Sequence, residues 1–431
     1  MPTLSIDLPT PAPAETARPT FYSWVVFALT FGLLISDYMA RQVLNAVFPL
    51  LKSEWALSDT SLGALSGVVA LTVGLLTFPL SLLADRWGRI RSITLMAMLW
   101  SIATLACGMA RSYEEMFAAR LLLGLGEAAY GSVGIAVVVS VFPKSLRATL
   151  SAAFMAGGLL GQVLGVGLGG RIADAHGWRA AFIVIALAGL ALAFIYPLLI
   201  GEKRTAALAD RFGNSAGDLE RKRPSLKGLF ARRSLVFAYL GSGFQLYVAG
   251  ALTAWLPTYF HDTYRMSIGA AGQRAALFLA ASGAGMVLCA MVSDRLSKRR
   301  DTAKYDVAIA CCIACALTIG LAFALPPGPA QLGALAVGAF FAAASCGPAG
   351  AMVANLTSAR IHATAFATLT VANNALGLAP GPILTGRLAD SWALADALAI
   401  TPVAAVAAAI LFWIGRRSYP EDLAANASSP A

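Results

Sequence analysis

The chain has 431 residues, of which 58% are hydrophobic and only 13% are charged. A soluble domain is about 45–50% apolar and about 25% charged, so this composition excludes a soluble globular protein and indicates many membrane-spanning segments. The formal net charge of +10 would suit a nucleic-acid partner, but the placement of the basic residues along the chain accounts for it differently.

The N-terminal residues 1–20 are rich in Pro and Thr and lack the basic segment of a signal peptide, so we expect a disordered cytoplasmic tail. Segments of about 20 mostly apolar residues, each long enough to cross a bilayer, follow this tail. We expect twelve of them, at residues 22–50, 61–84, 93–110, 115–142, 148–170, 180–200, 234–260, 273–293, 305–325, 331–355, 362–386 and 397–415. The sequence therefore predicts an all-α membrane protein.

Residues 201–233 interrupt the apolar pattern with a polar, charge-rich stretch. We expect a cytoplasmic linker here, with room for a short amphipathic helix. It divides the chain into an N-terminal six-helix half at 21–200 and a C-terminal six-helix half at 234–415. Residues 416–431 form a cytoplasmic C-terminal tail in this interpretation.

Basic residues concentrate on one side of the predicted topology. With the N-terminus in the cytoplasm, 23 of the 32 Lys and Arg residues fall in cytoplasmic segments and 7 in outer segments, while Arg41 and Arg120 lie within the membrane. Positive charges favour the cytoplasmic side, so both termini are expected there, in the inner (plasma) membrane. This bias accounts for the positive net charge, so no nucleic-acid partner is expected, and the cytoplasmic basic residues face anionic lipid head groups.

Four ionisable side chains lie at membrane depth. Asp37 and Arg41 are one helical turn apart in the first segment, and Arg120 and Glu127 are two turns apart in the fourth. Intramembrane charges normally face a partner, a cavity or a pathway. The two segments run in opposite directions, which places both carboxyl groups near the midplane and the two arginines about 6 and about 10 Å further outward.

The charge balance of these four residues predicts proton-coupled anion binding. A proton on one carboxylate leaves an arginine without a full partner, free to bind a carboxylate or phosphate in bidentate fashion. We predict Glu127 first and Asp37 second as proton-coupling residues, with Arg41 and Arg120 as anion-binding residues. Static salt bridges that fix helix packing are the alternative, although two desolvated pairs are a costly way to hold helices together.

The C-terminal half differs, because its predicted segments carry no acidic or basic residue away from their ends. Polar and aromatic side chains amid Phe and Leu could instead form an apolar wall with a few hydrogen-bonding groups. We predict that the further substrate-binding residues are Gln245, Tyr247, Asn373 and Asn374 in this half, with Tyr130 in the N-terminal half. Ordinary helix packing is an equal alternative for each of the four in the C-terminal half.

A charged motif occurs once in each half. ADRWGRIR follows the second segment and SDRLSKRR follows the eighth, which argues for duplication. An Asp beside a basic cluster at a cytoplasmic helix junction can hold neighbouring helix ends in one conformation and release them in another. The predicted clamp comprises Asp85, Arg86, Arg89, Asp294 and Arg295. Topogenic charge alone is the alternative, but it does not require the Asp.

Twelve segments, the division into two halves and this loop motif resemble the major facilitator superfamily. The first loop matches GxLaDRxGRr except that Ser81 replaces the usual first Gly, and RLLLGLGEAA matches the RxxxGxG pattern of the fourth helix. RLLLGLGEAAYG, GLGGRIADAHGWRAAF, WLPTYF and ATAFATLTVANNALGLAPGPILTGRLAD are similar to spinster-like transporters. The Arg-x6-Glu spacing also resembles anion:cation symporters. Both groups usually carry Asp-Arg in the first helix, where this chain has Ala40 before Arg41.

The resemblance implies a monomeric secondary transporter that works by alternating access and is coupled to protons. Its substrate is expected to be an organic or amphipathic anion, lysolipid-like as in spinster-like relatives or a carboxylate. A small organic-acid/proton symporter is the alternative, and multidrug efflux by antiport is a third. No enzyme activity, cofactor or metal is expected, because the sequence lacks a catalytic motif and its three His and six Cys are scattered or lie in apolar segments.

Overall fold

The computed structural model describes residues 18–212, 229–230, 232–358 and 361–427, and within these the chain folds into helices without a strand. The predicted tail at 1–20 lies almost wholly outside the described residues. The N-terminal half contains α1 (Phe21–Ala46), α2 (Phe48–Trp55), α3 (Asp59–Trp87), α4 (Arg89–Met109), α5 (Tyr113–Glu127), α6 (Tyr130–Ser140), the 3-10 helix η2 (Lys144–Leu146), α7 (Arg147–His176), α8 (Trp178–Leu199) and α9 (Glu202–Arg211).

The helices of the C-terminal half follow. This half contains α10 (Arg233–Tyr264), α11 (Ile268–Ser297), α12 (Ala303–Ala324), α13 (Pro329–Ala342), α14 (Cys346–Leu356), α15 (His362–Asn373), the π-helix η5 (Asn374–Leu378), α16 (Pro380–Ala389), α17 (Leu394–Ala399) and α18 (Pro402–Ala427). α18 continues beyond residue 415, so most of the predicted C-terminal tail is helical.

Eleven helical stretches of the described residues are long and apolar enough to cross a membrane. They correspond to every predicted segment except 362–386. In that segment α15 passes into the π-helix η5 and then into α16, which begins at Pro380. A proline ring cannot donate to the backbone ladder, so it interrupts the regular helix. The twelfth crossing therefore stays a prediction.

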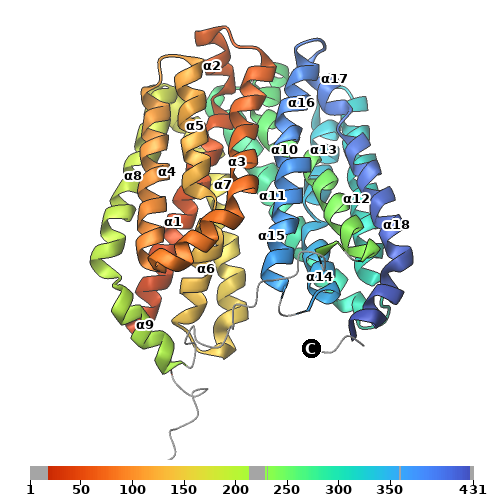
Figure 1. Cartoon of the computed structure of the whole chain (residues 1–431). Helices are drawn as coiled ribbons and strands as arrows, with labels where there is room; N and C mark the ends of the chain where they lie inside the picture. Colours follow the sequence, from red (N-terminus) through yellow and green to blue (C-terminus); the bar gives the residue numbers. More distant parts are fainter. Residues whose placement is uncertain (1–17, 213–228, 231, 359–360, 428–431) are drawn as a thin grey trace, which may run out of the picture.

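The two halves stand side by side, with α1–α9 on one side of Figure 1 and α10–α18 on the other. Their backbones approach closely toward the end of the bundle where α2 and α17 lie, called here the α2 end. A β-carbon added to Gly63 of α3 would lie 2.3 Å from the carbonyl oxygen of Pro382. One added to Gly272 of α11 would lie 2.8 Å from the carbonyl oxygen of Val166. Small residues permit this contact, as is usual between membrane helices.

The short helix α9 lies in the predicted linker, of which residues 213–228 and 231 are not described. Its Glu202 carboxylate accepts hydrogen bonds from the backbone N–H groups of Arg89 and Ile90, at the start of α4. Thr205 on the same helix is buried and lies within hydrogen-bonding distance of the Tyr22 hydroxyl. The linker therefore begins as a helix fastened to the N-terminal half, at the end of the bundle opposite the α2 end.

Candidate functional site

A cavity of about 400 Å³ lies between the two halves. Its polar lining comes from both halves and consists of Tyr38, Arg41, Gln42, Asn45, Ser66, Gln162, Thr253, Ser282, Thr370, Asn373 and Asn374. Apolar side chains such as Leu159, Leu246 and Leu279 complete the wall. The cavity thus combines several hydrogen-bonding groups with a predominantly apolar surface.

Among the described residues that line the cavity, Arg41 alone carries a charge. Its side chain is half-buried, and its guanidinium makes no hydrogen bond or ion pair with another described residue. A guanidinium presents a planar fork of donors that matches a carboxylate or a phosphate. An anion that enters the cavity therefore meets the Arg41 guanidinium, whose N–H donors bind no other described residue.

Arg120 has the opposite environment. It is completely buried and does not line the cavity. Its Nε donates to the carbonyl oxygen of Leu65 at 3.1 Å, while Nη1 donates to that of Ala40 at 3.3 Å and Nη2 to that of Arg41 at 3.1 Å. Arg120 thus connects α5 to α1 and α3. Arg120 forms no ion pair with a described carboxylate, because main-chain carbonyl groups occupy its donors. Its predicted role in anion binding stays a prediction.

Asp37 and Glu127 face each other, as their common depth predicts. Both are more than nine-tenths buried, and their carboxyl groups lie within hydrogen-bonding reach of one another. Oδ1 of Asp37 and Oε1 of Glu127 have no hydrogen-bond partner among the described residues. Both carboxyl groups also lie close enough to Arg41 to interact with its charge, although no ion pair forms. The pair lies behind the cavity wall, one helical turn from Arg41.

Glu127 is the last residue of α5, and the chain turns through Ala128 and Ala129 before α6 begins. The predicted continuous segment 115–142 is thus interrupted at its acidic residue. Tyr130, at the start of α6, is buried and donates its hydroxyl to the carbonyl oxygen of Thr30 at 2.5 Å. It contributes to the packing behind the carboxyl pair and does not line the cavity.

The other predicted binding residues divide into two groups. Asn373 and Asn374 line the cavity, whereas Gln245 and Tyr247 do not. Gln245 donates to the carbonyl oxygens of Phe341 and Ala342, next to the break between α13 and α14. Gln245 is therefore committed to helix packing in this structure.

Asn374 opens the π-helix η5, a form that often occurs at functional sites. Its Nδ2 donates to the carbonyl oxygen of Thr370, while its buried Oδ1 has no partner among the described residues. Asn373 accepts a hydrogen bond from Ser242 through Oδ1. Asn374 thus presents an unused acceptor at the wall of the C-terminal half.

The sequence analysis did not identify a polar network next to Arg41. Asn45 donates to Oε1 of Gln42 at 2.7 Å and accepts from Ser66 at 3.0 Å through Oδ1. All three residues line the cavity. Gln42 directly follows Arg41, Asn45 lies one turn beyond it, and Ser66 is on α3. Their polar character within apolar segments was the available signal.

The predicted clamp lies at the α9 end of the bundle, and the side chain of Asp85 is outside the described residues. Arg86, Asp294 and Arg295 are exposed, and none of them forms an ion pair with another described residue. Arg89 is half-buried, and its backbone N–H binds Glu202. The clamp remains a prediction.

A family model described as the Major Facilitator Superfamily matches residues 30–337, more than half of the chain. The chain belongs to the major facilitator superfamily. It is therefore a multi-pass membrane transporter, and the predictions of transport and of no enzyme activity are confirmed.

Similar proteins support the same assignment. A probable L-galactonate transporter of Escherichia coli is 27% identical over 307 residues, which are 69% of this chain and 68% of that protein. Protein spinster homolog 3 of Danio rerio is 28% identical over 253 residues, which are 57% of this chain and 50% of that protein. The predicted resemblance to spinster-like and anion transporters is confirmed.

A solved structure has the same fold. A bacterial homolog of the human lysosomal transporter Spinster, in an inward-facing and occupied conformation, superposes with a TM-score of 0.82 and 21% sequence identity. The match covers 96% of this chain and all of that structure. The all-α major facilitator fold is thereby confirmed.

Proposed function

We propose that the protein is a proton-coupled secondary transporter that moves an organic anion by alternating access. The observation that carries this proposal is the unengaged Arg41 guanidinium in the central cavity, one turn from a buried carboxyl pair. Arg41 binds the anionic group of the substrate. Arg120 acts through Arg41, because it holds the main chain on which Arg41 is mounted.

Asp37 and Glu127 form the proton site of this proposal. Two carboxyl groups that face each other inside a protein repel one another when both are ionised. A proton between them removes this repulsion and gives their unpartnered oxygens a hydrogen bond. When the proton leaves, the negative charge of the ionised carboxylate stays near Arg41 and competes with the substrate anion. Proton binding and anion binding therefore favour each other, which is the linkage that symport needs.

The conformation is inward-open in this proposal. The basic residues put both termini and the α9 end in the cytoplasm of a cell with an inner (plasma) membrane, with twelve crossings in total. The α2 end is then the outer end, where the two halves pack closely. The likeness in fold to an inward-facing structure supports this orientation. The two halves rock about the central cavity, and the exposed Asp294 and Arg295 form clamp contacts in the opposite state.

A small hydroxylated carboxylate is the substrate that the cavity favours. The network of Gln42, Asn45 and Ser66 lies beside Arg41, and Asn374 presents its free acceptor from the other half. Groups of this kind recognise hydroxyl groups, and a site built to bind hydroxyls rejects analogues that lack them. Similarity to a probable L-galactonate transporter points the same way.

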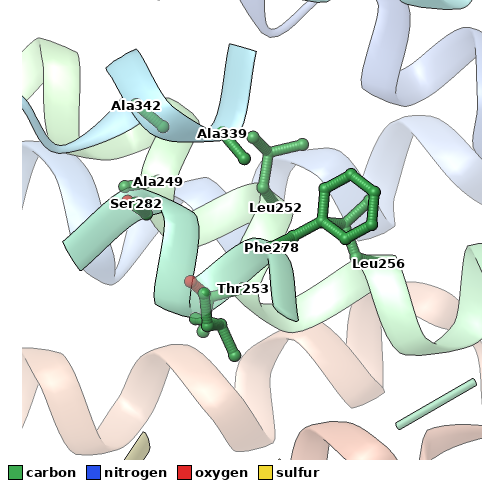
Figure 2. A pocket seen from close by; sticks show the side chains of 9 residues that line it. Ala249, Leu252, Thr253, Leu256, Phe278, Ser282, Ala339 and Ala342 are labelled. Carbon is green, nitrogen blue, oxygen red and sulfur yellow. The ribbon is translucent and has the colours of Figure 1, made fainter. Parts of the chain in front are cut away.

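An amphipathic, lysolipid-like anion is the second candidate, and a side pocket favours it. Leu252, Leu256 and Phe278 line this pocket, which adjoins the cavity at Ala249 and Ser282 (Figure 2). Its volume is only about 20 Å³, which is room for about one water molecule. An acyl chain would enter it only after these side chains move apart, so we place this candidate second. The similarity to spinster homologs motivates it.

Flux in proteoliposomes tests the proposal. Proteoliposomes that contain the purified protein should accumulate a hydroxylated carboxylate such as galactonate when an inward proton gradient is imposed. They should take up a lysophospholipid poorly or not at all. Arg41→Gln should abolish uptake, while Arg91→Gln, at an exposed arginine, should not. Equal uptake by the Arg41→Gln variant, or uptake that ignores the proton gradient, contradicts the proposal.

A further inference from the structure

A five-residue sequence recurs at matching places in the two halves. GRIAD occupies residues 170–174 in α7, and GRLAD occupies 386–390 at the end of α16. In each half this segment ends the fifth predicted crossing, at the α2 end of the bundle. The transport site uses neither copy, although both copies belong to runs that resemble spinster-like transporters.

The second copy reaches the opposite half through Asp390. Its Oδ1 accepts the backbone N–H of Asp59 at 2.6 Å. Its Oδ2 accepts the backbone N–H of Thr60 at 3.1 Å and the Thr60 hydroxyl at 2.5 Å. Asp59 and Thr60 are the first two residues of α3. A carboxylate of the C-terminal half thus caps the N-terminus of a helix in the N-terminal half.

The first copy makes the corresponding contact through Asp174. Its Oδ2 accepts a hydrogen bond from the Ser267 hydroxyl at 2.8 Å. Ser267 is the N-cap residue of α11, just as Ser58 is the N-cap residue of α3. Each Asp therefore faces the N-terminus of the second crossing of the other half.

The glycine of each copy packs against the same helix N-terminus that the aspartate of that copy faces. A β-carbon on Gly386 would lie 2.3 Å from the carbonyl oxygen of Asp59, the residue after the N-cap of α3. A β-carbon on Gly170 would lie 3.2 Å from the carbonyl oxygen of Ile268, the residue after the N-cap of α11. The absence of a side chain brings each carboxylate to the helix terminus of the other half. The two contacts are thus duplicated in backbone packing as well as in sequence.

We propose that the two GRxAD segments form a paired outer latch, in which Asp390 and Asp174 are positioning residues that hold the outer ends of the halves together. A negative charge at a helix N-terminus is stabilised by the unpaired N–H groups and by the helix dipole. Rotation of the halves toward an outward-open state separates each Asp from its helix. The latch therefore favours the inward-open state, and this inference rests on the alternating access proposed above.

The two contacts differ in strength. Asp390 accepts three hydrogen bonds from α3, two of them from the backbone, whereas Asp174 accepts one from a side chain. Both carboxylates are exposed, so water can replace the lost bonds when the latch opens. A contact that solvent can take over is reversible, as a gate in a transport cycle requires. Asp390 should carry the larger share of the latch.

Distances between spin labels at the outer end test the latch. Labels on Ser53→Cys and Ala330→Cys, two exposed positions in opposite halves, report the separation of the halves in nanodiscs. Asp390→Ala should shift the ratio of outward-open to inward-open molecules about fivefold toward the outward-open state. Asp174→Ala should shift it less and the double variant more. Asp396→Ala, at an exposed aspartate of α17, is the matched control and should leave the ratio unchanged.

The chain supplies a second readout. Cys346 lines the central cavity, so an impermeant maleimide added outside should modify it only in outward-open molecules. Asp390→Ala should raise its labelling rate from outside about fivefold, and Asp390→Asn, which keeps an acceptor, should raise it less.

The latch is refuted if wild-type protein populates two distances but Asp390→Ala and Asp174→Ala match Asp396→Ala in both the distance ratio and the labelling rate. A single wild-type distance, unchanged by pH or substrate, would instead contradict alternating access itself. The two failures are therefore distinguishable.

Discussion

The guanidinium of Arg120 donates a hydrogen bond to the main-chain carbonyl oxygen of Arg41 at 3.1 Å. One arginine of the pair is thus a scaffold for the other. Arg120 satisfies carbonyl groups of α1 and α3, and Arg41 projects from that backbone into the cavity. Two arginines with similar sequence signatures consequently have different expected functions, and substitution separates them.

Replacing Arg41 should remove substrate binding and leave folding almost unchanged. Hydrogen bonds to charged groups contribute about 1.5–3 kcal/mol, so Arg41→Gln should weaken anion binding about 10- to 100-fold. Because Arg41 is half-buried and makes no side-chain hydrogen bond with a described residue, the thermal midpoint should hardly move. Isothermal titration and thermal unfolding in detergent measure the two quantities.

Replacing Arg120 should have the reverse effect. Arg120→Leu removes three buried hydrogen bonds from a charged guanidinium, and a hydrogen bond to a charged group contributes about 1.5–3 kcal/mol. We therefore expect poor expression and a much lower thermal midpoint. A stable Arg120→Leu protein that has lost only anion affinity would show that Arg120 binds the substrate directly.

Neutralising the carboxyl pair should uncouple transport from protons. The glutamine in Glu127→Gln cannot release a proton, so the second negative charge of the pair, which competes for Arg41, cannot form at any pH. In wild-type protein, anion affinity should fall as pH rises and the pair ionises. In the variant it should stay high and independent of pH. Substrate exchange should continue, while accumulation driven by a proton gradient should stop.

Counterflow and gradient-driven uptake in the same liposomes distinguish these activities. Glu114→Gln, at an exposed glutamate, is the matched control and should behave like wild type. Asp37→Asn should show the same uncoupling, because Asp37 is within hydrogen-bonding reach of Glu127. Normal gradient-driven accumulation by both variants would disprove the proton site.

The sequence predicted the depth of the charged residues but not the direction of their side chains. Opposite helix directions correctly brought Asp37 and Glu127 to one level. Anion binding was the role predicted for Arg120, with static salt bridges as the alternative. The structure gives its donors main-chain carbonyl acceptors, which have no sequence signature. The break after Glu127 was also missed, since its turn consists of two alanines without Gly or Pro.

The fold was more predictable than the site because it depends on composition. Segments of apolar residues determine where helices cross, whereas the cavity depends on how those helices are rotated. Asn373 and Asn374 were predicted as binding residues together with Gln245. Their polarity alone could not tell a cavity-lining residue from one that packs between helices. The structure separates them, because Asn373 and Asn374 line the cavity and Gln245 does not.

The outer latch should be insensitive to pH through the neutral range. Burial raises the pKa of Asp390, but hydrogen bonds from Thr60 and the backbone, with Lys52 nearby, lower it further, so the net pKa is below the ordinary value of 3.8. A carboxylate with a lowered pKa stabilises the closed state above that value and loses this effect as pH falls through its folded pKa.

The spin-label ratio should therefore respond to Asp390 only in acid below about pH 4. The charges around this contact are Lys52, Asp59 and Asp262. The measurement belongs in an Asp37→Asn/Glu127→Gln background, which removes both titrating groups of the carboxyl pair. A latch that opens between about pH 5 and 7 in this background, but not in Asp390→Ala, would contradict the lowered pKa.

Asn374 should decide which anions bind. Its Oδ1 is buried at the cavity wall and has no partner, so it can accept a hydrogen bond from a substrate hydroxyl. Asn374→Ala should weaken binding of a hydroxylated carboxylate about 5- to 10-fold, because a neutral hydrogen bond contributes about 1 kcal/mol. Binding of a carboxylate without hydroxyl groups should change little.

Asn355→Ala, at an asparagine bonded to Tyr419 and outside the cavity lining, is the matched control. Equal losses for both kinds of carboxylate would mean that Asn374 shapes the cavity without recognising hydroxyl groups.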